Sequence, residues 1–190
     1  MEQLKRLLMK ECDYEPREET LDLLLASSEA MTLGADFEII PTGAVIRDLF
    51  IVKSGIIRSV DMDGEKERTL GFGTAGSVFT SKHSFVKGLP SYYTFETCCP
   101  SEILRLPFAS YQRLIRDCPD FAMWMLYYAN EELFLNEVRN SQVINGSAKE
   151  RYLALCKARP EILRKVKQRT IASYLGVTPE YLSRLRKLKD

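Results

Sequence analysis

Histidine is almost missing from this chain, whose 190 residues include only His83. A metal site of the cupin type takes two or three histidines, and a Ser-His-Asp or Cys-His arrangement would have to rest on this one residue. There is no phosphate-binding P-loop, and Gly71-Phe72-Gly73 is too short to indicate a dinucleotide-binding loop. We therefore expect a binding protein with no catalytic residue and no metal, rather than an enzyme.

Long apolar runs and paired cysteines are also missing. No run approaches the ~20 apolar residues that span a bilayer, and the charged N-terminus lacks the apolar core of a signal peptide. The odd number and irregular spacing of the cysteines argue against a disulfide framework. They are Cys12, Cys98, Cys99, Cys118 and Cys156. We expect a cytoplasmic protein with no membrane partner.

The charges that are present are unevenly divided along the chain. The formal net charge is only +1. Residues 147–190 carry twelve lysines and arginines against four carboxylates, a net charge of +8, and residues 1–146 carry −7. This division predicts two modules with different partners, and the basic C-terminal module is the candidate for binding a polyanion.

Short β-like segments follow a helical beginning. Residues 2–32 read as helical on both sides of Pro16. From Gly34 to Leu106 the apolar segments are short and are separated by glycine and proline, and Asp63-Gly64 is typical of a hairpin turn. Six to eight such strands predict a small antiparallel barrel or sandwich.

A long helix is predicted after this β-rich region. A short helix should end near Pro119, and residues 120–144 contain neither glycine nor proline. One broad stripe of this helix is aromatic and apolar. The stripe consists of Trp124, Tyr127, Tyr128, Phe134, Leu135 and Val138. It either packs on the chain's own barrel or pairs with a second copy in a homodimer.

The C-terminal segment predicts a helix-turn-helix after a hinge at residues 145–147. Gly176 suits the left-handed position that ends a first helix. Thr178 is a good N-cap, Pro179 suits the first position of a second helix, and Glu180 favours its first turn. The apolar positions of both helices fall on one side. These local signals agree with a DNA-reading unit.

The second helix would then enter the major groove. Arg184 suits two hydrogen bonds to guanine, and Glu180 suits one from cytosine. Thr178, Ser183 and Lys187 suit phosphate contacts, which add affinity but little sequence choice.

At this point the chain resembles the Crp/Fnr family of bacterial transcription regulators. The resemblance rests on three segments: LFIVKSGIIRSVDMDGEKERTL, PSEILRLPFASYQRLIRDCPDF and IASYLGVTPEYLSRLRK. It implies an α+β fold: an antiparallel β-barrel or jelly roll of the cyclic-nucleotide-binding type with flanking helices, a long dimerisation helix and an all-α helix-turn-helix domain. The corresponding boundaries are 1–118, 119–145 and 146–190. The short C-terminus is similar to members from Bacteroidetes-type bacteria.

The resemblance also implies sites and partners. The family forms homodimers that bind a near-palindromic DNA operator, with RNA polymerase as an additional partner. The DNA-binding residues would be Arg169, Thr170, Thr178, Glu180, Tyr181, Ser183, Arg184 and Lys187. The dimer helix would use Trp124, Tyr127, Phe134 and Val138. The effector pocket would include Gly76, Phe79, Ser81, Ser91, Tyr92, Asn136 and Glu137.

The effector is where this chain departs from the family. Members that bind cyclic AMP hold its phosphate with an Arg-Ser pair, whose positions correspond here to Ser91 and Tyr92. Asn136 and Glu137 replace the Thr-Ser pair that touches adenine. A cyclic phosphate would lose a charge-assisted bidentate contact, so we expect no tight binding of cyclic AMP. Cys12 alone cannot hold the iron–sulfur cluster of other members, and a lone histidine gives little support for haem.

Two alternatives stay open at the level of sequence. The chain could be a ligand-binding or protein-interaction module that does not read DNA, because Pro179 offers no group to a base or phosphate where many relatives place one. The Cys98-Cys99 pair lies in a strand-like segment, so the two side chains should point to opposite faces. They are either small buried side chains or redox-active thiols.

Overall fold

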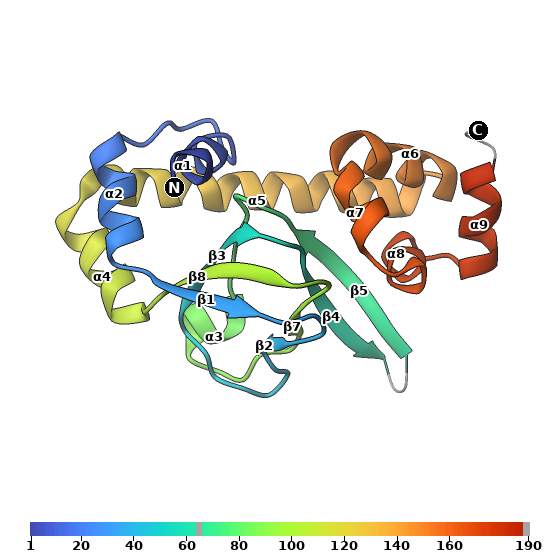
Figure 1. Ribbon diagram of the computed structural model, residues 1–190, viewed down its shortest axis with the longest axis horizontal. Helices are drawn as coiled ribbons and strands as arrows, with labels where there is room; N and C mark the ends of the chain where they lie inside the picture. The colour runs from blue at the N-terminus through green and yellow to red at the C-terminus, as the bar shows by residue number, and fades with distance from the viewer. Residues whose placement is uncertain (64–65, 188–190) are drawn as a thin grey trace.

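The computed structural model describes residues 1–63 and 66–187, except for the side chains of Asp63 and of residues 142–144. It confirms the predicted α+β fold. A long helix runs along the molecule, with a β domain below its middle and helices at both ends (Figure 1). Two short helices begin the chain: α1 (Glu2–Leu8) and α2 (Glu18–Ala26).

Among the described residues, eight strands form two antiparallel four-stranded sheets, which we call the barrel. The strands are β1 (Glu29–Leu33), β2 (Glu38–Ile40), β3 (Leu49–Ser54), β4 (Ile57–Asp63), β5 (Lys66–Gly73), β6 (Val78–Phe79), β7 (Thr94–Thr97) and β8 (Ser101–Leu106). One sheet has the order β1-β8-β3-β6 and the other β2-β7-β4-β5. In this second sheet β5 is an edge strand, and the C-terminal helices lie beside it (Figure 1).

The barrel interior is filled by apolar side chains from both sheets. Phe79 of β6 stacks on Phe50 of β3 at 5.3 Å and on Phe95 of β7 at 5.7 Å between ring centroids. Because β3 and β7 belong to different sheets, this stack connects the two layers. The one helix inserted between β6 and β7, α3 (Lys82–Lys87), was not predicted from the sequence.

Two predicted local features have different outcomes. The helical prediction for residues 2–32 is wrong at its end, since β1 begins at Glu29 and pairs with β8. That pairing is long-range and leaves little trace in the local pattern. The Asp63-Gly64 turn lies partly outside the described residues, although β4 and β5 do pair, with Asp63 opposite Lys66.

The long helix, α5 (Pro119–Asn145), follows α4 (Phe108–Asp117) as predicted. Trp124 is fully buried and Tyr128 is nearly so, both in a core shared with α1, α2 and the barrel. The Tyr128 hydroxyl donates to the carbonyl of Val78 at 2.7 Å and accepts from its N–H at 3.2 Å. These contacts fix α5 on β6.

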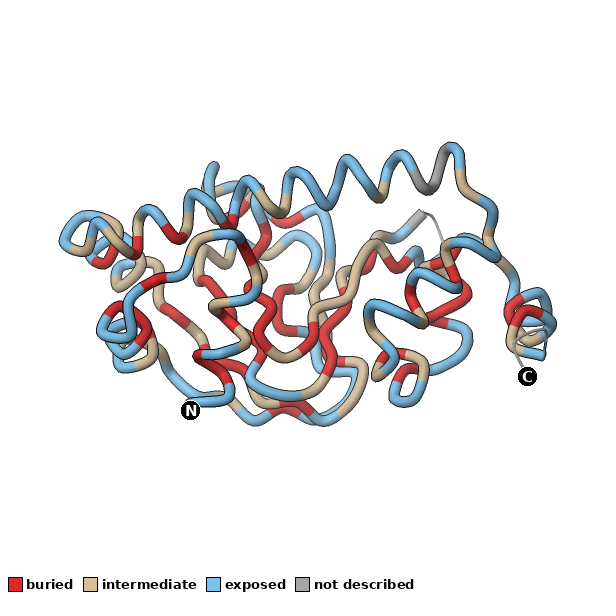
Figure 2. The backbone as a smooth tube through the Cα atoms, turned by 90° about the horizontal axis from the view of Figure 1, so that it is seen from above, coloured by how far each residue is buried: buried red, intermediate tan, exposed pale blue. Residues whose placement is uncertain are grey.

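The predicted aromatic stripe of α5 is in fact two faces. Trp124 and Tyr128 face the chain's own core, so the assignment of Trp124 to a dimer surface is wrong. A second face is exposed, and Figure 2 shows that most of the helix is uncovered beyond its first turns. Its large apolar side chains are Met123, Leu126, Tyr127, Leu133, Phe134, Leu135 and Val138. Among the described residues, no helix combines the length and the apolar character needed to cross a membrane.

Four helices form the C-terminal module. They are α6 (Ala148–Ala158), α7 (Pro160–Lys165), α8 (Gln168–Leu175) and α9 (Pro179–Lys187). Ser147 starts the module with a capping box: its hydroxyl accepts from the Glu150 N–H, and the Glu150 carboxylate accepts from the Ser147 N–H. Pro160 begins α7 and so separates it from α6.

Candidate functional site

The α8–α9 pair has the turn that the sequence predicts. Gly176 ends α8 in the left-handed region, with φ 67° and ψ 36°. Thr178 caps α9 by accepting a hydrogen bond from the Tyr181 N–H at 3.2 Å. Pro179 is the first residue of α9. The buried side chains of the pair are Ile171, Ala172, Leu175, Leu182 and Leu185. The local chemistry of this turn therefore predicted its geometry.

The outer face of α9 is available to a partner. Glu180, Tyr181, Arg184 and Lys187 are exposed, and Ser183 is half-buried. The Arg184 guanidinium lies 5.4 Å from the centre of the Tyr181 ring. Hydrogen bonds from its own backbone N–H and from Thr178 lower the pKa of Glu180, so this carboxylate stays charged near neutral pH. A cation and a carboxylate are thus presented side by side.

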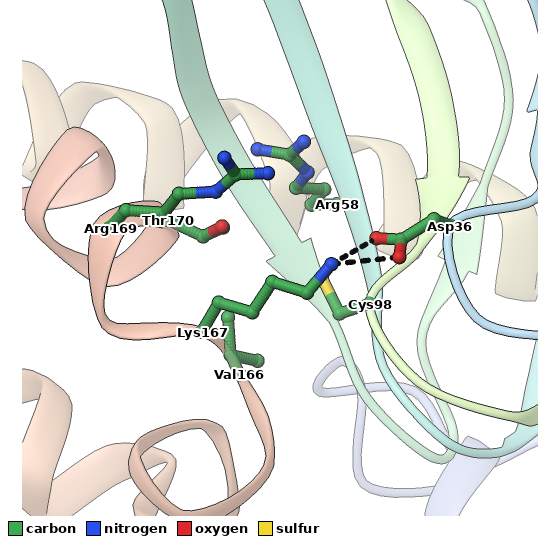
Figure 3. A pocket seen from close by; sticks show the side chains of 7 residues that line it. All are labelled: Asp36, Arg58, Cys98, Val166, Lys167, Arg169 and Thr170. Atoms are coloured by element: carbon green, nitrogen blue, oxygen red, sulfur yellow. Dashed lines mark hydrogen bonds and ion pairs between the residues drawn. The ribbon is translucent and has the colours of Figure 1, made fainter.

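The amino-terminal end of α8, in contrast, faces the barrel (Figure 3). Lys167 precedes the helix and donates to both carboxylate oxygens of Asp36, at 2.9 and 2.7 Å. The hydrogen bond with Lys167 lowers the pKa of Asp36. We call this contact between α8 and the barrel the junction. The predicted DNA contact Thr170 is buried in it, whereas Arg169 stays exposed beside it. This end of α8 therefore contacts the chain's own N-terminal domain.

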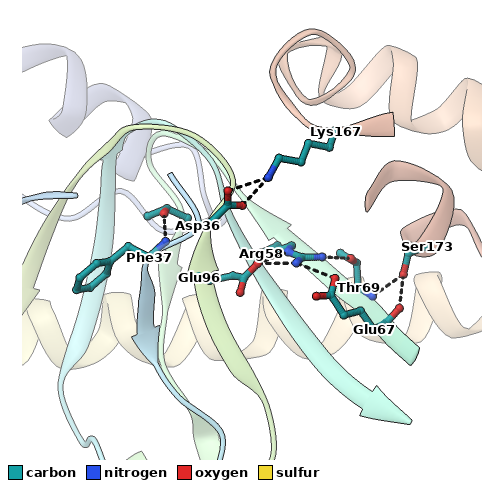
Figure 4. A network of polar contacts seen from close by, with 9 residues as sticks. Asp36, Phe37, Arg58, Glu67, Thr69, Glu96, Lys167 and Ser173 are labelled. Atoms are coloured by element: carbon teal, nitrogen blue, oxygen red, sulfur yellow. Dashed lines mark hydrogen bonds and ion pairs between the residues drawn. The ribbon is translucent and has the colours of Figure 1, made fainter. Parts of the chain in front are cut away.

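Ser173 joins α8 to the open edge of β5. Its hydroxyl accepts from the Thr69 N–H at 2.9 Å and donates to the Glu67 carbonyl at 3.0 Å (Figure 4). The Ser173 side chain thus makes the hydrogen bonds that a further strand would make to these backbone groups. Backbone N–H and C=O groups on an edge strand lack a strand partner and are commonly covered by another element. The module is docked through the backbone of the barrel and not only through side chains.

An aromatic contact with β5 lies beside Ser173. Tyr174 packs on Phe72 of β5 with 4.9 Å between ring centroids, and Arg139 of α5 lies 4.4 Å from the Tyr174 ring centre. Burial lowers the pKa of Arg139. Arg159 also donates a hydrogen bond to Thr74. Three parts of the chain, α5, β5 and α8, therefore meet at this point.

A buried arginine lies behind the junction. Arg58 of β4 is 6% exposed and donates to Glu96 at 2.7 Å, to Glu67 at 3.0 Å and to Thr69 at 3.2 Å. Because two carboxylates and one hydroxyl accept its hydrogen bonds, the buried guanidinium is fully engaged in structural contacts. It fixes the strand edge that Ser173 contacts.

The junction is not packed solid. A hollow of about 170 Å³ lies between the β4–β5 hairpin and α8. Its walls are Arg58, Glu67, Arg169, Thr170 and Ser173. A smaller one beside it is lined in part by Asp36, Cys98 and Lys167 (Figure 3). Polar walls of this kind hold water more readily than an apolar ligand.

The predicted effector-pocket residues have other local partners. Gly76 has φ 98°, and a Cβ built there would lie 2.8 Å from Leu7 Cβ, so this glycine permits the close approach of α1. Ser81 caps α3. The Ser91 hydroxyl donates to the Tyr93 carbonyl at 2.7 Å, and Tyr92 is exposed.

The other three positions lie on β6 and on α5. Phe79 belongs to the ring stack inside the barrel, and Asn136 and Glu137 are exposed on α5. His83, at 2.7 Å from the Pro90 carbonyl, stacks on Tyr92 near the end of α3. The predicted pocket residues therefore come from the α1 contact, the start of α3, the barrel interior and the surface of α5.

One glycine pattern was missed by the sequence analysis. Gly71, Gly73 and Gly76 together have the full GxGxxG spacing. In dinucleotide-binding loops these glycines follow a strand and open a helix. Here they lead from β5 into the short strand β6 of the other sheet. The pattern carries no dinucleotide site in this fold.

Comparison with known proteins agrees with this architecture. Residues 32–118 match the family model of the cyclic nucleotide-binding domain. The chain has the fold of the Crp/Fnr regulators. No curated protein is similar to it by sequence alone.

Several solved structures cover most of the chain, among them the following three. The c-di-GMP responsive global regulator CLP of Xanthomonas campestris has a TM-score of 0.71 at 20% identity, over 91% of this chain and 92% of its own. The catabolite activator protein of Thermus thermophilus has a TM-score of 0.60 at 21% identity, over 96% and 85%. FixK2 of Bradyrhizobium japonicum has a TM-score of 0.71 at 19% identity, over 85% and 83%.

In this Crp/Fnr fold the vicinal cysteines lie beyond the end of β7, not within a strand. Cys98 and Cys99 are both half-buried against the core of the C-terminal module. The prediction that they point to opposite faces is therefore wrong, because the strand ends at Thr97. Burial raises the pKa of Cys98 to about 12. Such a thiol is a poor nucleophile near neutral pH.

We therefore expect Cys98 to react slowly with alkylating reagents. At pH ~8 a thiol of pKa about 12 is ~10⁻⁴ ionised, which is on the order of 10³-fold less than a free cysteine. Native protein treated with iodoacetamide, followed by tandem mass spectrometry, gives the rate at this site. In urea the same residue should react as a free thiol. Labelling of native Cys98 at the free-thiol rate would support a redox-active cysteine instead.

Proposed function

We propose that this protein is a dimeric, sequence-specific DNA-binding transcriptional regulator of the Crp/Fnr type. The observation that carries the proposal is the exposed face of α9, which presents Arg184 and Glu180 from a correctly capped two-helix unit. That unit belongs to a segment with a net charge of +8. The proposed division is a sensing barrel in residues 1–118, a dimer helix in 119–145 and a DNA-binding module in 146–190.

The roles on α9 follow from the chemistry of base edges. Arg184 is assigned to guanine, and Glu180 to the amino group of cytosine. Thr178, Ser183 and Lys187 are assigned to phosphates, which set the register of the module on the duplex. Tyr181 supports the Arg184 guanidinium through its ring. Pro179 gives the start of α9 a fixed backbone and offers no polar group to DNA.

The second copy is assigned to the uncovered face of α5. Leu126 is 54% exposed, Leu133 63% and Phe134 56%. From Met123 to Val138 the apolar side chains extend over about four helical turns. Such a stripe on one helix is self-complementary about a two-fold axis. Two copies joined there would offer two recognition helices to a near-palindromic operator.

The effector is proposed not to be cyclic AMP. Ser91 and Tyr92 provide no cation for a phosphate, and Tyr92 is 64% exposed. The stack of Phe50, Phe79 and Phe95 fills the interior with aromatic rings. A buried phosphate without a charged partner would pay a large desolvation penalty.

Replacing Arg184 by alanine should remove most of the operator preference. A bidentate contact with guanine contributes about 1–3 kcal/mol of discrimination, so the ratio of operator to random-sequence affinity should fall at least about fivefold. An operator is first selected from a random DNA pool with the unchanged protein, and affinities are then measured by fluorescence anisotropy.

The matched control is Arg113→Ala on α4, an exposed arginine at the opposite end of the molecule (Figure 1). It removes the same charge and should keep the preference. An unaltered preference in Arg184→Ala would contradict the assigned recognition helix. No salt-sensitive DNA retardation in the unchanged protein would favour a protein-interaction module instead.

Phe134→Asp should separate the dimer. It introduces two facing charges into an apolar seam, and we expect the dimer dissociation constant to rise at least about tenfold. Sedimentation velocity distinguishes a chain of 21.8 kDa from its dimer. The control Val86→Asp changes an apolar side chain of α3 that is 63% exposed. An unchanged protein that sediments as a monomer would refute the assigned interface.

Calorimetric titration with cyclic AMP should show no binding in the micromolar range, because no arginine is present at the phosphate position. The measurement uses purified, DNA-free protein at neutral pH. The positive control is the same titration with a cyclic-AMP-dependent regulator. A micromolar or lower dissociation constant would show that the barrel holds the phosphate by other groups.

A further inference from the structure

The first helix of a helix-turn-helix crosses the DNA backbone when the second enters the major groove. In this chain the first helix is α8, and its amino-terminal end consists of Lys167, Arg169 and Thr170. Side chains and amides at such an end are groups that contact phosphates. These residues line the junction with Asp36 and Arg58 (Figure 3). One surface of α8 therefore has two candidate occupants, the barrel and a DNA strand.

Asp36 presents two anionic oxygens to Lys167, as a phosphate would. Both accept from the ammonium group. Asp36 has φ 57°, an uncommon value for a residue other than glycine. Its own N–H donates to the Thr97 carbonyl at 2.9 Å. The backbone thus holds this carboxylate at a defined place, where it occupies two of the three N–H donors of Lys167.

The β5 edge covers the next turn of α8. Thr170 is 6% exposed, and the Ser173 hydroxyl is shared between the Thr69 N–H and the Glu67 carbonyl. A DNA backbone cannot approach these side chains from the same side. Arg169 is exposed at the rim and makes no hydrogen bond or ion pair within the described part of the chain, so it is ready for an anion.

The junction is also able to open. The Lys167 and Asp36 side chains are 52% and 59% exposed, and an ion pair of this kind contributes little and weakens with salt. The hollow of about 170 Å³ beside it shows that the polar part of the interface is incompletely packed. Polar interfaces between domains commonly separate. The phosphates of DNA are a denser array of negative charge than one carboxylate.

Resting on the proposed DNA-binding function, we propose that the barrel inhibits DNA binding by occupying α8. Asp36 takes the place of a phosphate at Lys167, and the β5 edge, held by Ser173, covers Thr170 beside it. DNA binds when the module leaves this position. Asp36 and a DNA phosphate therefore compete for the basic amino-terminal end of α8.

Only undocked protein binds DNA in this competition. The measured dissociation constant for DNA therefore equals the intrinsic one divided by the fraction of protein that is undocked. A docked state that is tenfold more populated than the undocked state weakens DNA binding about tenfold. Weakening the docking contact therefore strengthens DNA binding, which is the reverse of what loss of a DNA contact does. The direction of the change separates the two roles.

The test compares Asp36→Asn, Ser173→Ala and the double variant with the unchanged protein. Binding to a random-sequence duplex is measured by fluorescence anisotropy at low and at high salt. We expect a two- to fivefold tighter dissociation constant for each single variant and about tenfold for the double variant. The ratio of the DNA dissociation constants of the unchanged protein and Asp36→Asn should approach one as salt rises, because salt itself weakens the Lys167–Asp36 ion pair.

The charge-matched control is Glu15→Gln. Glu15 is exposed on the segment between α1 and α2, and α2 lies at the end of the molecule opposite α9 (Figure 1). The Glu15→Gln substitution removes one negative charge, as Asp36→Asn does. The DNA affinity of this variant should stay within about twofold of that of the unchanged protein. Equal tightening in Glu15→Gln and Asp36→Asn would overturn the proposal, because it would show a general charge effect.

Hydrogen exchange at one amide reports the docked state directly. The Thr69 N–H donates to the Ser173 hydroxyl. Its exchange should accelerate in Ser173→Ala without DNA, and in the unchanged protein when DNA is added. A purely structural contact would not respond to DNA.

Two further results have different meanings. Unchanged Thr69 exchange at saturating DNA, with equal affinities for all variants, would overturn the inhibition and leave the DNA-binding function intact. A complete lack of DNA binding in every variant would overturn both. Circular dichroism identifies a variant that fails to fold, and the remaining single variant then decides.

Discussion

The open edge of β5 is the constraint on which the position of the C-terminal module depends. A strand at the end of a sheet leaves backbone donors and acceptors unpaired, and these need a cover. Ser173 supplies one at Thr69 and Glu67. Arg58 is buried behind the same edge and contacts it through a hydrogen bond to Glu67, with a second hydrogen bond to Glu96. The helical module is therefore located by the barrel's backbone, while the ion pair of Lys167 adds a separable electrostatic contact.

The long helix connects this edge to the rest of the molecule. Near its start, Trp124 and Tyr128 are buried in the chain's own core. Farther along, Arg139 lies against Tyr174 of α8. A second copy of the chain on the exposed face of α5 would thus contact a helix that already contacts both the barrel and the C-terminal module. Dimer assembly and docking of that module share one rigid element.

Local chemistry made part of this structure predictable from sequence. Gly176 and Thr178 specify a turn through backbone conformation and capping, which act within a few residues. Features that depend on distant partners were not predictable. The strand from Glu29 is defined only by its pairing with β8, and the two faces of α5 differ only in what covers them. The docking of Ser173 on β5 likewise joins residues more than one hundred positions apart, and no local pattern encodes it.

The same limit explains why the predicted effector pocket was harder to derive from sequence than the α8–α9 turn. Recognition of a base edge needs a few side chains on one helix, whereas a pocket needs side chains from several elements. Here the aromatic stack of Phe79 occupies the barrel interior, and Lys82 of α3 pairs with Glu132 of α5. The helix α5 also contacts β6 through Tyr128 and α8 through Arg139. Because these contacts come from separate parts of the chain, no local sequence pattern could indicate that one helix connects them.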